Sequence, residues 1–270
     1  MPLSIKIKPG AKKIDLGAID PASTGPFKGK DDPRVQRQID DDARRLCDLQ
    51  ERLYAENKQS LLIILQAMDT GGKDGTIRHV VGPLDSRGCE VVSFKPPSVD
   101  EAAHDFLWRV HAKTPRKGEI VIFNRSHYEE VLVVRVMGLQ PKEVWSKRFD
   151  QINAFEKMLV ESGTRIVKIF LHISKDEQKR RLEARLSDPS KLWKFDPSDI
   201  KARARWDDYQ QAYGAALARC STDWAPWHVV PADSKWYRNL AVARLLVDAL
   251  EAMNPRYPDP VVDPKTITIE

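Results

Sequence analysis

Residues 61–76 decide the fold of this chain, and they read LLIILQAMDTGGKDGT. The aliphatic run from Leu61 to Leu65 predicts a strand that is buried on both faces, as in a parallel sheet covered by helices. The glycine-rich turn after it leads into a segment of helical period at about residues 73–82. Such a turn presents backbone N–H groups and the positive end of the helix dipole to phosphate. We therefore predict a phosphate-binding loop between this strand and this helix.

The loop departs from the standard pattern G-x-x-x-x-G-K-[ST] at two positions. Ala67 replaces the first glycine, and Asp74 replaces the metal-binding hydroxyl. The residues predicted to contact the phosphate chain are Gly71, Gly72, Lys73, Asp74 and Gly75. The alternative is a tight turn in which Lys73 faces solvent.

Asp69 places a carboxylate inside this loop. Bound phosphates would repel the carboxylate unless a Mg²⁺ ion stood between them, so we predict that Asp69 is a metal ligand and Mg²⁺ the cofactor. Through the metal, Asp69 would also polarise an attacking phosphate oxygen. An Asx turn that satisfies loop amides is the alternative for this residue.

A second polar cluster follows a later predicted strand, at residues 123–130, FNRSHYEE. Ligand groups gather at the carboxyl ends of parallel strands, so we expect this cluster beside the phosphate loop. We predict that Asn124 ligates the metal and contacts the nucleotide, and that Arg125 donates to phosphate. A structural ion pair is the alternative for Arg125.

Other residues near these motifs have two interpretations or a weaker signal. Ser126 and Glu129 fit a capping box, so Glu129 is either a nucleotide contact or a structural cap. His127 fits a packed polar residue better than a phosphorylated intermediate. Lys95, which follows another predicted strand, is a further candidate nucleotide contact. The catalytic candidates are Asp69, Lys73 and Arg125.

A basic stretch from Lys179 to Arg205 carries nine Lys or Arg residues against four Asp or Glu. Two Asp-Pro corners divide it into a helix–loop–helix, which we predict to be a closing lid over about residues 175–215. Arg181 and Arg185 share one helical face at i and i+4 and are predicted to bind phosphate. An exposed basic face without a ligand is the alternative.

Along the rest of the chain, short β-branched runs alternate with segments of helical period. The five predicted strands lie at residues 60–66, 90–94, 119–124, 166–172 and 227–231. Helices are predicted at about residues 33–57, 73–82, 99–112, 141–162, 175–187, 197–218 and 235–253. This alternation is typical of a three-layer α/β/α fold with a mainly parallel sheet. We predict one continuous domain at residues 32–255, preceded by an arm (1–31) over the domain or a neighbouring subunit and followed by an extended tail (256–270).

Composition excludes several classes of protein. With 270 residues, 41% of them hydrophobic and 31% charged, the chain fits one large globular domain and no disordered or collagen-like protein. The net charge of +5 favours an anionic partner. The three cysteines are too widely spaced for a disulfide framework or a zinc site, so we expect the cytoplasm. The longest aliphatic run is far shorter than the roughly 20 residues that a membrane span needs, and we expect no membrane partner.

The two loop motifs, the arginine-rich lid and the sequence WAPW at residues 224–227 together closely resemble the family-2 polyphosphate kinases. The resemblance covers roughly residues 32–255. It implies a P-loop kinase fold, Mg²⁺, and reversible transfer of the terminal phosphate of inorganic polyphosphate to AMP and ADP, giving ADP and ATP. It also implies a homo-oligomer, either a dimer or a tetramer.

Individual residues carry this resemblance. Asp69, Lys73 and Arg125 match the family's loop aspartate, its phosphate-binding lysine and its second-motif arginine. Asn124 stands where many members have aspartate, and Val134 stands where many have a glutamate that helps to hold metal. The NRSHYE form of the second motif looks like the subgroup that accepts both AMP and ADP. Basic residues in the lid and at 113–117 suit a long anionic donor.

Two other functions compete with this interpretation. An ordinary nucleoside monophosphate kinase would use ATP as the donor and would not depend on polyphosphate. A non-catalytic basic module would bind RNA or polyphosphate without turnover. Because a carboxylate such as Asp69 inside a phosphate loop would weaken simple anion binding, we expect an enzyme and no nucleic-acid partner.

Overall fold

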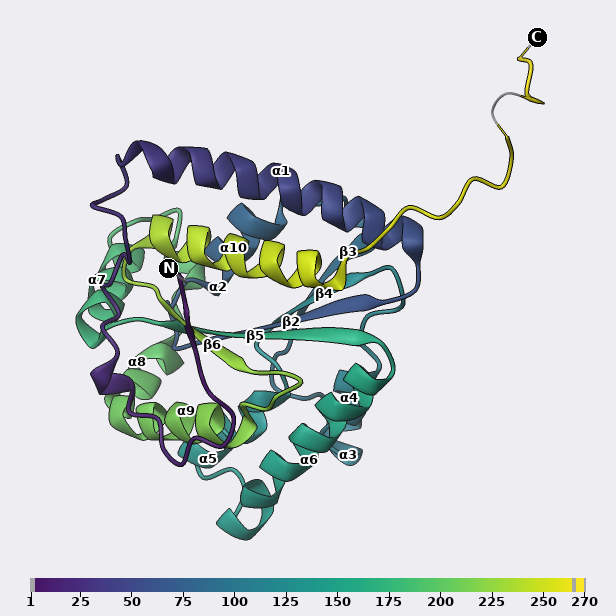
Figure 1. The fold of residues 1–270 in the computed structure, drawn as a ribbon. Helices are drawn as coiled ribbons and strands as arrows, with labels where there is room; N and C mark the ends of the chain where they lie inside the picture. Colours follow the sequence, from purple (N-terminus) through teal and green to yellow (C-terminus); the bar gives the residue numbers. More distant parts are fainter. Residues whose placement is uncertain (1–2, 264–265, 270) are drawn as a thin grey trace.

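A mainly parallel sheet forms the middle layer of the protein (Figure 1). The computed structural model describes residues 3–263 and 266–269, and its strands lie in the order β1-β6-β5-β2-β4-β3. The parallel strands are β2 (Ser60–Ala67), β3 (Cys89–Ser93), β4 (Ile120–Asn124), β5 (Thr164–His172) and β6 (Trp227–Pro231). These strands match the five predicted ones, and the α/β/α fold class is confirmed.

The prediction of five strands is wrong by one, because the N-terminal arm contributes a sixth. The short strand β1 (Ile5–Lys6) pairs antiparallel with β6 at the edge of the sheet. Two residues are too few to show a strand period, so the sequence carried no signal for it. Leu16 of the arm is buried, and the Ser221 hydroxyl donates to the carbonyl of Ile7 at 2.7 Å. The described part of the arm therefore packs on its own domain.

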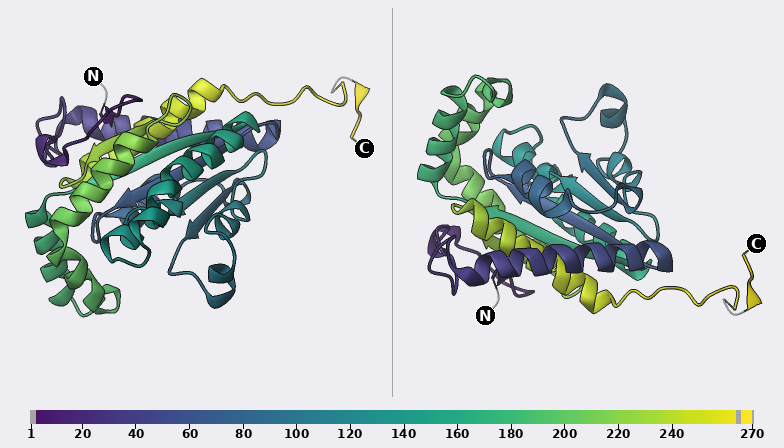
Figure 2. Two further views of the ribbon diagram at one scale, coloured as in Figure 1. Left: turned by 90° about the horizontal axis from the view of Figure 1, so that it is seen from below. Right: turned by 90° about the horizontal axis from the view of Figure 1, so that it is seen from above.

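Helices cover both faces of the sheet (Figures 1 and 2). One layer holds α1 (Pro33–Glu56), α10 (Lys235–Met253) and α2 (Lys73–Thr76) with its π-helical continuation η2 (Ile77–Val81). The other layer holds α5 (Val133–Val136), α6 (Lys142–Glu161) and α9 (Trp206–Cys220). The single-turn elements are η1 (Leu16–Ala18), η3 (Ser86–Gly88), η4 (His127–Glu130) and η5 (Leu192–Lys194). No helix in the part of the chain described here is long and apolar enough to cross a membrane.

The lid and the segment after β3 project from the same side of the sheet (Figure 2). The lid contains α7 (Lys175–Leu186) and α8 (Pro197–Ala204), and the other segment contains α3 (Val99–Ala103) and α4 (Trp108–His111). Two helices predicted as continuous are thus broken. Asp105 accepts from the Leu107 amide at 2.9 Å between α3 and α4, and Arg205 leaves the helical conformation between α8 and α9. Breaks this short leave the apolar spacing intact, so periodicity did not detect them.

The tail was predicted to be extended over residues 256–270. Its described residues form no helix or strand longer than an isolated 3₁₀ residue, and they lead away from the domain in Figure 1. Positions 264, 265 and 270 of the predicted tail lie outside the described residues, as do positions 1 and 2 of the predicted arm.

A buried lysine joins the sheet to the helical layer that contains α6 and α9. The ammonium of Lys168, on β5, donates to Glu156 Oε2 and to the Cys220 carbonyl, both at 2.5 Å, and to the Tyr128 hydroxyl at 2.9 Å. All three of its donors are therefore satisfied. The Tyr128 hydroxyl donates in turn to Glu156 Oε1, which also lies 3.3 Å from His127 Nε2. Burial alone would raise the pKa of Glu156, but the Lys168 ammonium and His127 lower it overall.

Replacing Glu156 with alanine should lower the free energy of unfolding by about 3–5 kcal/mol, because the fully buried Lys168 would lose its counter-charge. Urea denaturation at pH 7 measures the loss. Glu161→Ala is the matched control, since Glu161 lies on the same helix in an exposed pair with Lys157; it should cost less than about 1 kcal/mol.

The difference between wild type and Glu156→Ala should also depend on pH. A carboxyl whose pKa is lowered by folding stabilises the protein above its unfolded pKa, and this stabilisation is lost as the pH falls. The difference should therefore be full at neutral pH and shrink as the pH drops below the ordinary glutamate value of 4.5. Equal stabilities of the two proteins at pH 7 would contradict this account of the cluster.

Candidate active site

The predicted phosphate loop has the expected geometry of a strand, a glycine turn and a helix. It joins the end of β2 at Ala67 to the start of α2 at Lys73. Thr70 and Gly72 have left-handed backbones, with φ of 62° and 100°. This conformation costs a residue with a Cβ roughly 1–2 kcal/mol. Thr70 is therefore held in place by its surroundings, as strained residues of ligand-binding loops often are.

The loop's own polar groups decide between the alternatives for its residues. The Lys73 ammonium donates to the Ala67 carbonyl at 3.1 Å, so the side chain folds back across the loop and does not face solvent. The Asp69 carboxylate accepts from Arg125 and, among the described residues, from no loop amide, which excludes the Asx turn. The Gly71 amide donates to the Met68 carbonyl at 2.9 Å, so it is used within the turn. The amides that begin α2 have no partner inside the helix.

The second motif lies beside this loop, as predicted. Strands β2 and β4 are parallel neighbours, with Leu65 opposite Asn124. Arg125 Nη2 lies 2.8 Å from Asp69 Oδ1, and Asn124 Nδ2 donates to Asp74 Oδ1 at 3.0 Å. Arg125 has a positive φ of 63°, which turns its side chain out of the strand direction. The ion pair weighed as the alternative for Arg125 does form, and its partner belongs to the phosphate loop.

Glu129 is not the cap that the sequence allowed. The Ser126 hydroxyl accepts from the Tyr128 amide at 3.1 Å, and Glu129 Oε2 lies 4.0 Å from Arg125 Nη1. Burial raises the pKa of the Glu129 carboxyl, and Arg125 opposes that shift. His127 is fully buried against Glu156, which fits the packed polar residue that the sequence favoured.

The balance of charge around the loop favours the binding of a metal ion. Lys73 and Arg125 face three carboxylates, those of Asp69, Asp74 and Glu129. Burial, followed by the neighbouring Arg125, lowers the pKa of Lys73. An excess of carboxylates would repel a phosphate chain unless a cation neutralised it.

The donor set fits Mg²⁺ that is bound jointly with substrate. Within residues 3–263 and 266–269, no three His, Cys, Asp or Glu side chains are arranged to hold a metal by themselves. Mg²⁺ usually takes one or two protein carboxylates and completes its shell with phosphate and water. Asp69 can supply a carboxylate, and the Asn124 amide oxygen is not used in its hydrogen bond to Asp74. Val134 is buried in α5 and offers no oxygen.

Arg181 braces the phosphate loop. Its Nη1 donates to the Thr70 carbonyl at 3.0 Å, and its Nη2 donates to the carbonyls of Ala232 and Asp233 after β6, at 2.6 and 3.0 Å. Its Nε donates to Glu177 at 2.7 Å. These contacts use four of the five guanidinium N–H donors, so one N–H on Nη1 remains for the predicted phosphate contact, which stays a prediction.

Arg185 is engaged less completely, and by residues of the lid. Its Nη1 lies 3.2 Å from both the Lys194 carbonyl and Asp199 Oδ2. The shared helical face of Arg181 and Arg185 therefore holds protein groups together. Nε and Nη2 of Arg185 make no hydrogen bond to the residues that the structure describes, and the phosphate role of both arginines stays a prediction.

Lys95 and the 113–117 cluster lie at opposite ends of the parallel strands. Lys95 is exposed two residues after the end of β3, at the same sheet edge as Asn124. The cluster at 113–117 precedes β4, so it lies at the opposite edge, and Arg116 pairs there with Glu119. A strand of this length separates the two edges by roughly 16 Å at ~3.3 Å per residue. The cluster therefore does not lie at the phosphate loop, and its suitability for a long donor stays a prediction.

Residues of the lid and of α9 that the sequence did not single out lie within range of the site's charges. The charge of Asp69 adds to burial in raising the pKa of Asp199, in α8, and of Tyr209, in α9, the latter to about 12. Burial and the carboxylates of Glu129 and Asp69 also raise the pKa of Tyr213. Arg238, in α10, is 3% exposed and lies against Gly72. Apolar periodicity hides such residues, because it assigns them to the core.

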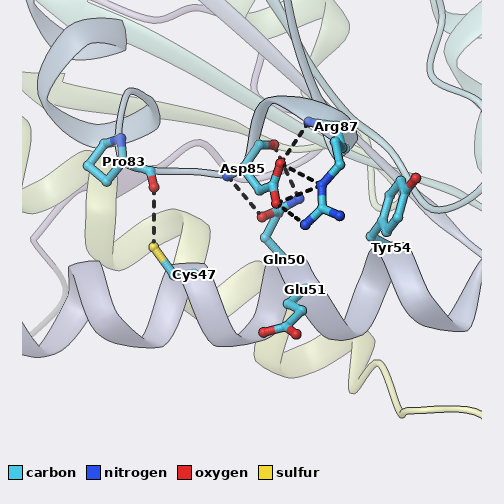
Figure 3. Close-up of a pocket in the computed structure, with 8 residues that line it drawn as sticks. Cys47, Gln50, Glu51, Tyr54, Pro83, Asp85 and Arg87 are labelled. Carbon is cyan, nitrogen blue, oxygen red and sulfur yellow. Dashed lines mark hydrogen bonds and ion pairs between the residues drawn. The ribbon is translucent and has the colours of Figure 1, made fainter.

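A pocket of about 390 Å³ lies away from this site, between α1 and η3 (Figure 3). Its arginine, Arg87, is paired with Asp85 at 2.5 Å, and Cys47 donates to the Pro83 carbonyl at 3.6 Å. The pocket precedes β3 and so lies at the sheet edge opposite the phosphate loop. It offers no part of the predicted chemistry.

The chain matches the family model described as Polyphosphate kinase 2 (PPK2) over residues 29–258. It belongs to this family. It is 50% identical to an AMP/ADP-polyphosphate phosphotransferase of Meiothermus ruber, with 96% of each chain covered. It is 44% identical to an ADP-polyphosphate phosphotransferase of Rhodopseudomonas palustris, over 92% of this chain and 89% of the relative. The crystal structure of polyphosphate kinase 2 from Arthrobacter aurescens has a TM-score of 0.89 and 44% identity, covering 97% and 96% of the two chains.

The brace made by Arg181 can be tested by Arg181→Met, which should lower the free energy of unfolding by about 2–3 kcal/mol, since several carbonyls and Glu177 lose a charged donor. It should also speed amide hydrogen exchange in residues 68–73. Arg180→Met is the matched control, because Arg180 pairs with the same Glu177 from an exposed position. Unchanged exchange in the loop would show that Arg181 does not brace it.

Proposed function

We propose that this chain transfers the terminal phosphate of inorganic polyphosphate to AMP and to ADP, forming ADP and ATP in a reversible reaction. The observation that carries the proposal is the ion pair of Asp69 and Arg125, which joins the phosphate loop to the second motif in a member of the polyphosphate kinase 2 family. Support for both acceptors comes from the relative named an AMP/ADP-polyphosphate phosphotransferase. The second motif, NRSHYE, points to the same subgroup.

The proposed reaction is an in-line transfer. A terminal phosphate oxygen of the nucleotide attacks the end phosphorus of the polyphosphate, a new P–O bond forms, and the P–O bond to the shortened chain breaks. Phosphoryl transfer needs positioning and charge neutralisation above all. The amides that begin α2 and the Lys73 ammonium hold the donor phosphates, and Arg125 neutralises charge on the transferred group.

The acceptor lies on the other side of the transferred group, toward β3 and β4. Lys95, Asn124 and Glu129 are the proposed nucleotide contacts. Mg²⁺, held by Asp69 and Asn124, supplies charge neutralisation between the two substrates. No covalent enzyme intermediate is required, and the buried contact of His127 with Glu156 fits that view.

We further propose a cytoplasmic homo-oligomer, a dimer or a tetramer, that acts without nucleic acid. Support for a reducing compartment comes from the free thiols of Cys47, Cys89 and Cys220. Burial raises the pKa of Cys89 to about 11, so its reactive thiolate is suppressed. The oligomer rests on the family resemblance.

The donor and the acceptors can be tested together. Purified protein with Mg²⁺, long-chain polyphosphate and AMP should form ADP first and ATP later, and ADP as the substrate should give ATP directly. Chromatography of the three nucleotides over time follows both steps. Phosphate exchange between ATP and a monophosphate, with no turnover of polyphosphate, would instead assign the chain to the ordinary nucleoside monophosphate kinases.

Replacing Arg125 with alanine should lower kcat by about 100-fold or more, because it removes a preorganised donor from the transferred phosphate. Asp69→Asn and Lys73→Ala should abolish turnover while the thermal midpoint stays close to that of wild type. Lys12→Ala, at an exposed position of the arm, is the control and should keep its rate. Equal losses in Arg125→Ala and Lys12→Ala would refute the catalytic assignment.

A further inference from the structure

Arg238 is a buried arginine without a counter-ion in the described part of the chain. It lies in the first turns of α10, and only 3% of its surface is exposed. Its Nε and Nη2 donate to the neutral side-chain oxygen of Asn239, at 3.1 and 2.8 Å. Its charged neighbour is another cation, Arg181. Burial and that neighbour lower the pKa of Arg238 to about 10, so the guanidinium remains charged at neutral pH.

The guanidinium lies directly against the phosphate loop. A Cβ at Gly72 would lie 1.9 Å from Arg238 Nη1, and one at Gly75 would lie 3.1 Å from Nη2. The absence of side chains at these two glycines therefore makes room for the arginine. Nη1 makes no hydrogen bond to any residue that the structure describes. A charged donor is thus held beside the loop with part of its hydrogen-bonding capacity unused.

Three other arginines near the loop each have a carboxylate partner in the protein. Arg125 pairs with Asp69, Arg181 with Glu177, and Arg185 with Asp199, at 2.8, 2.7 and 3.2 Å. Keeping a guanidinium buried without a carboxylate costs several kcal/mol. A protein retains such a charge where an anionic ligand completes the pairing, as in other sites that sacrifice stability for function.

We propose that Arg238 belongs to the polyphosphate donor site, where its charge is neutralised by the bound phosphate chain and not by the protein. This inference rests on the proposed use of polyphosphate as the donor. It places the donor chain on the side of the phosphate loop next to α7 and α10, while the acceptor occupies the side next to β3 and β4. Arg238 is a positioning residue here, since it supplies charge behind the loop and holds no reacting atom.

The inference predicts opposite effects on stability and on donor binding. Arg238→Met replaces the unpaired charge with an apolar side chain of similar length, so the free protein should keep or raise its thermal midpoint. The KM for polyphosphate should rise about 10-fold or more, because the variant loses a charged donor to that chain and a loss of about 1.4 kcal/mol corresponds to a tenfold change. The KM for ADP should stay within about 2-fold, because the acceptor occupies the other side of the loop. Arg238→Lys, which keeps the charge, should recover most of the donor KM.

Arg244→Met is the matched control on the same helix. Arg244 is neutralised by Asp42 at 3.0 Å and by Asp248 at 2.7 Å, so its loss should lower the thermal midpoint and leave both KM values unchanged. The pattern for a purely structural arginine is therefore measured alongside that for Arg238.

The deciding experiment measures the rise in thermal midpoint that polyphosphate causes without nucleotide. Wild type should show a rise, and Arg238→Met should show a much smaller one. The same rise in both proteins, or equal changes in the two KM values, would overturn the role of Arg238. No rise in wild type would instead refute polyphosphate as the donor, so the two failures are distinguishable. If Arg238→Met does not fold, Arg238→Lys decides, and a large loss of donor binding in that folded variant would overturn the assignment to charge.

Discussion

The position of the second motif, which carries Arg125, depends on the hydrogen bonds of the buried Lys168 ammonium. A charge in the interior must be paired and hydrogen-bonded, and here the partners come from α6, from the end of α9 and from the segment after β4. The last of these partners is Tyr128, which lies three positions after Arg125 in the sequence. Satisfying Lys168 therefore also fixes the chain that carries Arg125, so that stability and site geometry have one origin.

Some residues of the second motif stabilise the core, and others form the site. Ser126, His127 and Tyr128 are each at most 2% exposed and belong to the core. Asn124 and Arg125 face the phosphate loop, with which they form a hydrogen bond and an ion pair. The positive φ of Arg125 marks the point where the chain changes from one task to the other. This strain is maintained because the core partners on one side and Asp69 on the other both hold the segment in place.

The sequence predicted the convergence of the two motifs because both follow buried strands, and parallel strands end at one edge of a sheet. The same rule locates the 113–117 cluster away from the loop: it precedes its strand, and residues before parallel strands gather at the opposite edge. The partners of Arg181 could not be predicted, since its acceptors are backbone carbonyls of separate loops. Strand β1 was not predicted because two residues are too short for a pattern. Arg238 was not predicted as a site residue because it lies in an apolar helix.

The charge of the lid has a different meaning in the structure from the one that composition suggests. Of the nine basic residues between Lys179 and Arg205, six have an acidic partner within 4 Å. These pairs cancel much of the field that the excess of positive charge would otherwise produce. Attraction of a phosphate chain then depends on cations that the fold leaves unpaired, together with free amides and a metal ion. Such groups are few, and each must be held at the loop by the core, which is why a buried cation such as Arg238 matters more there than several exposed lysines.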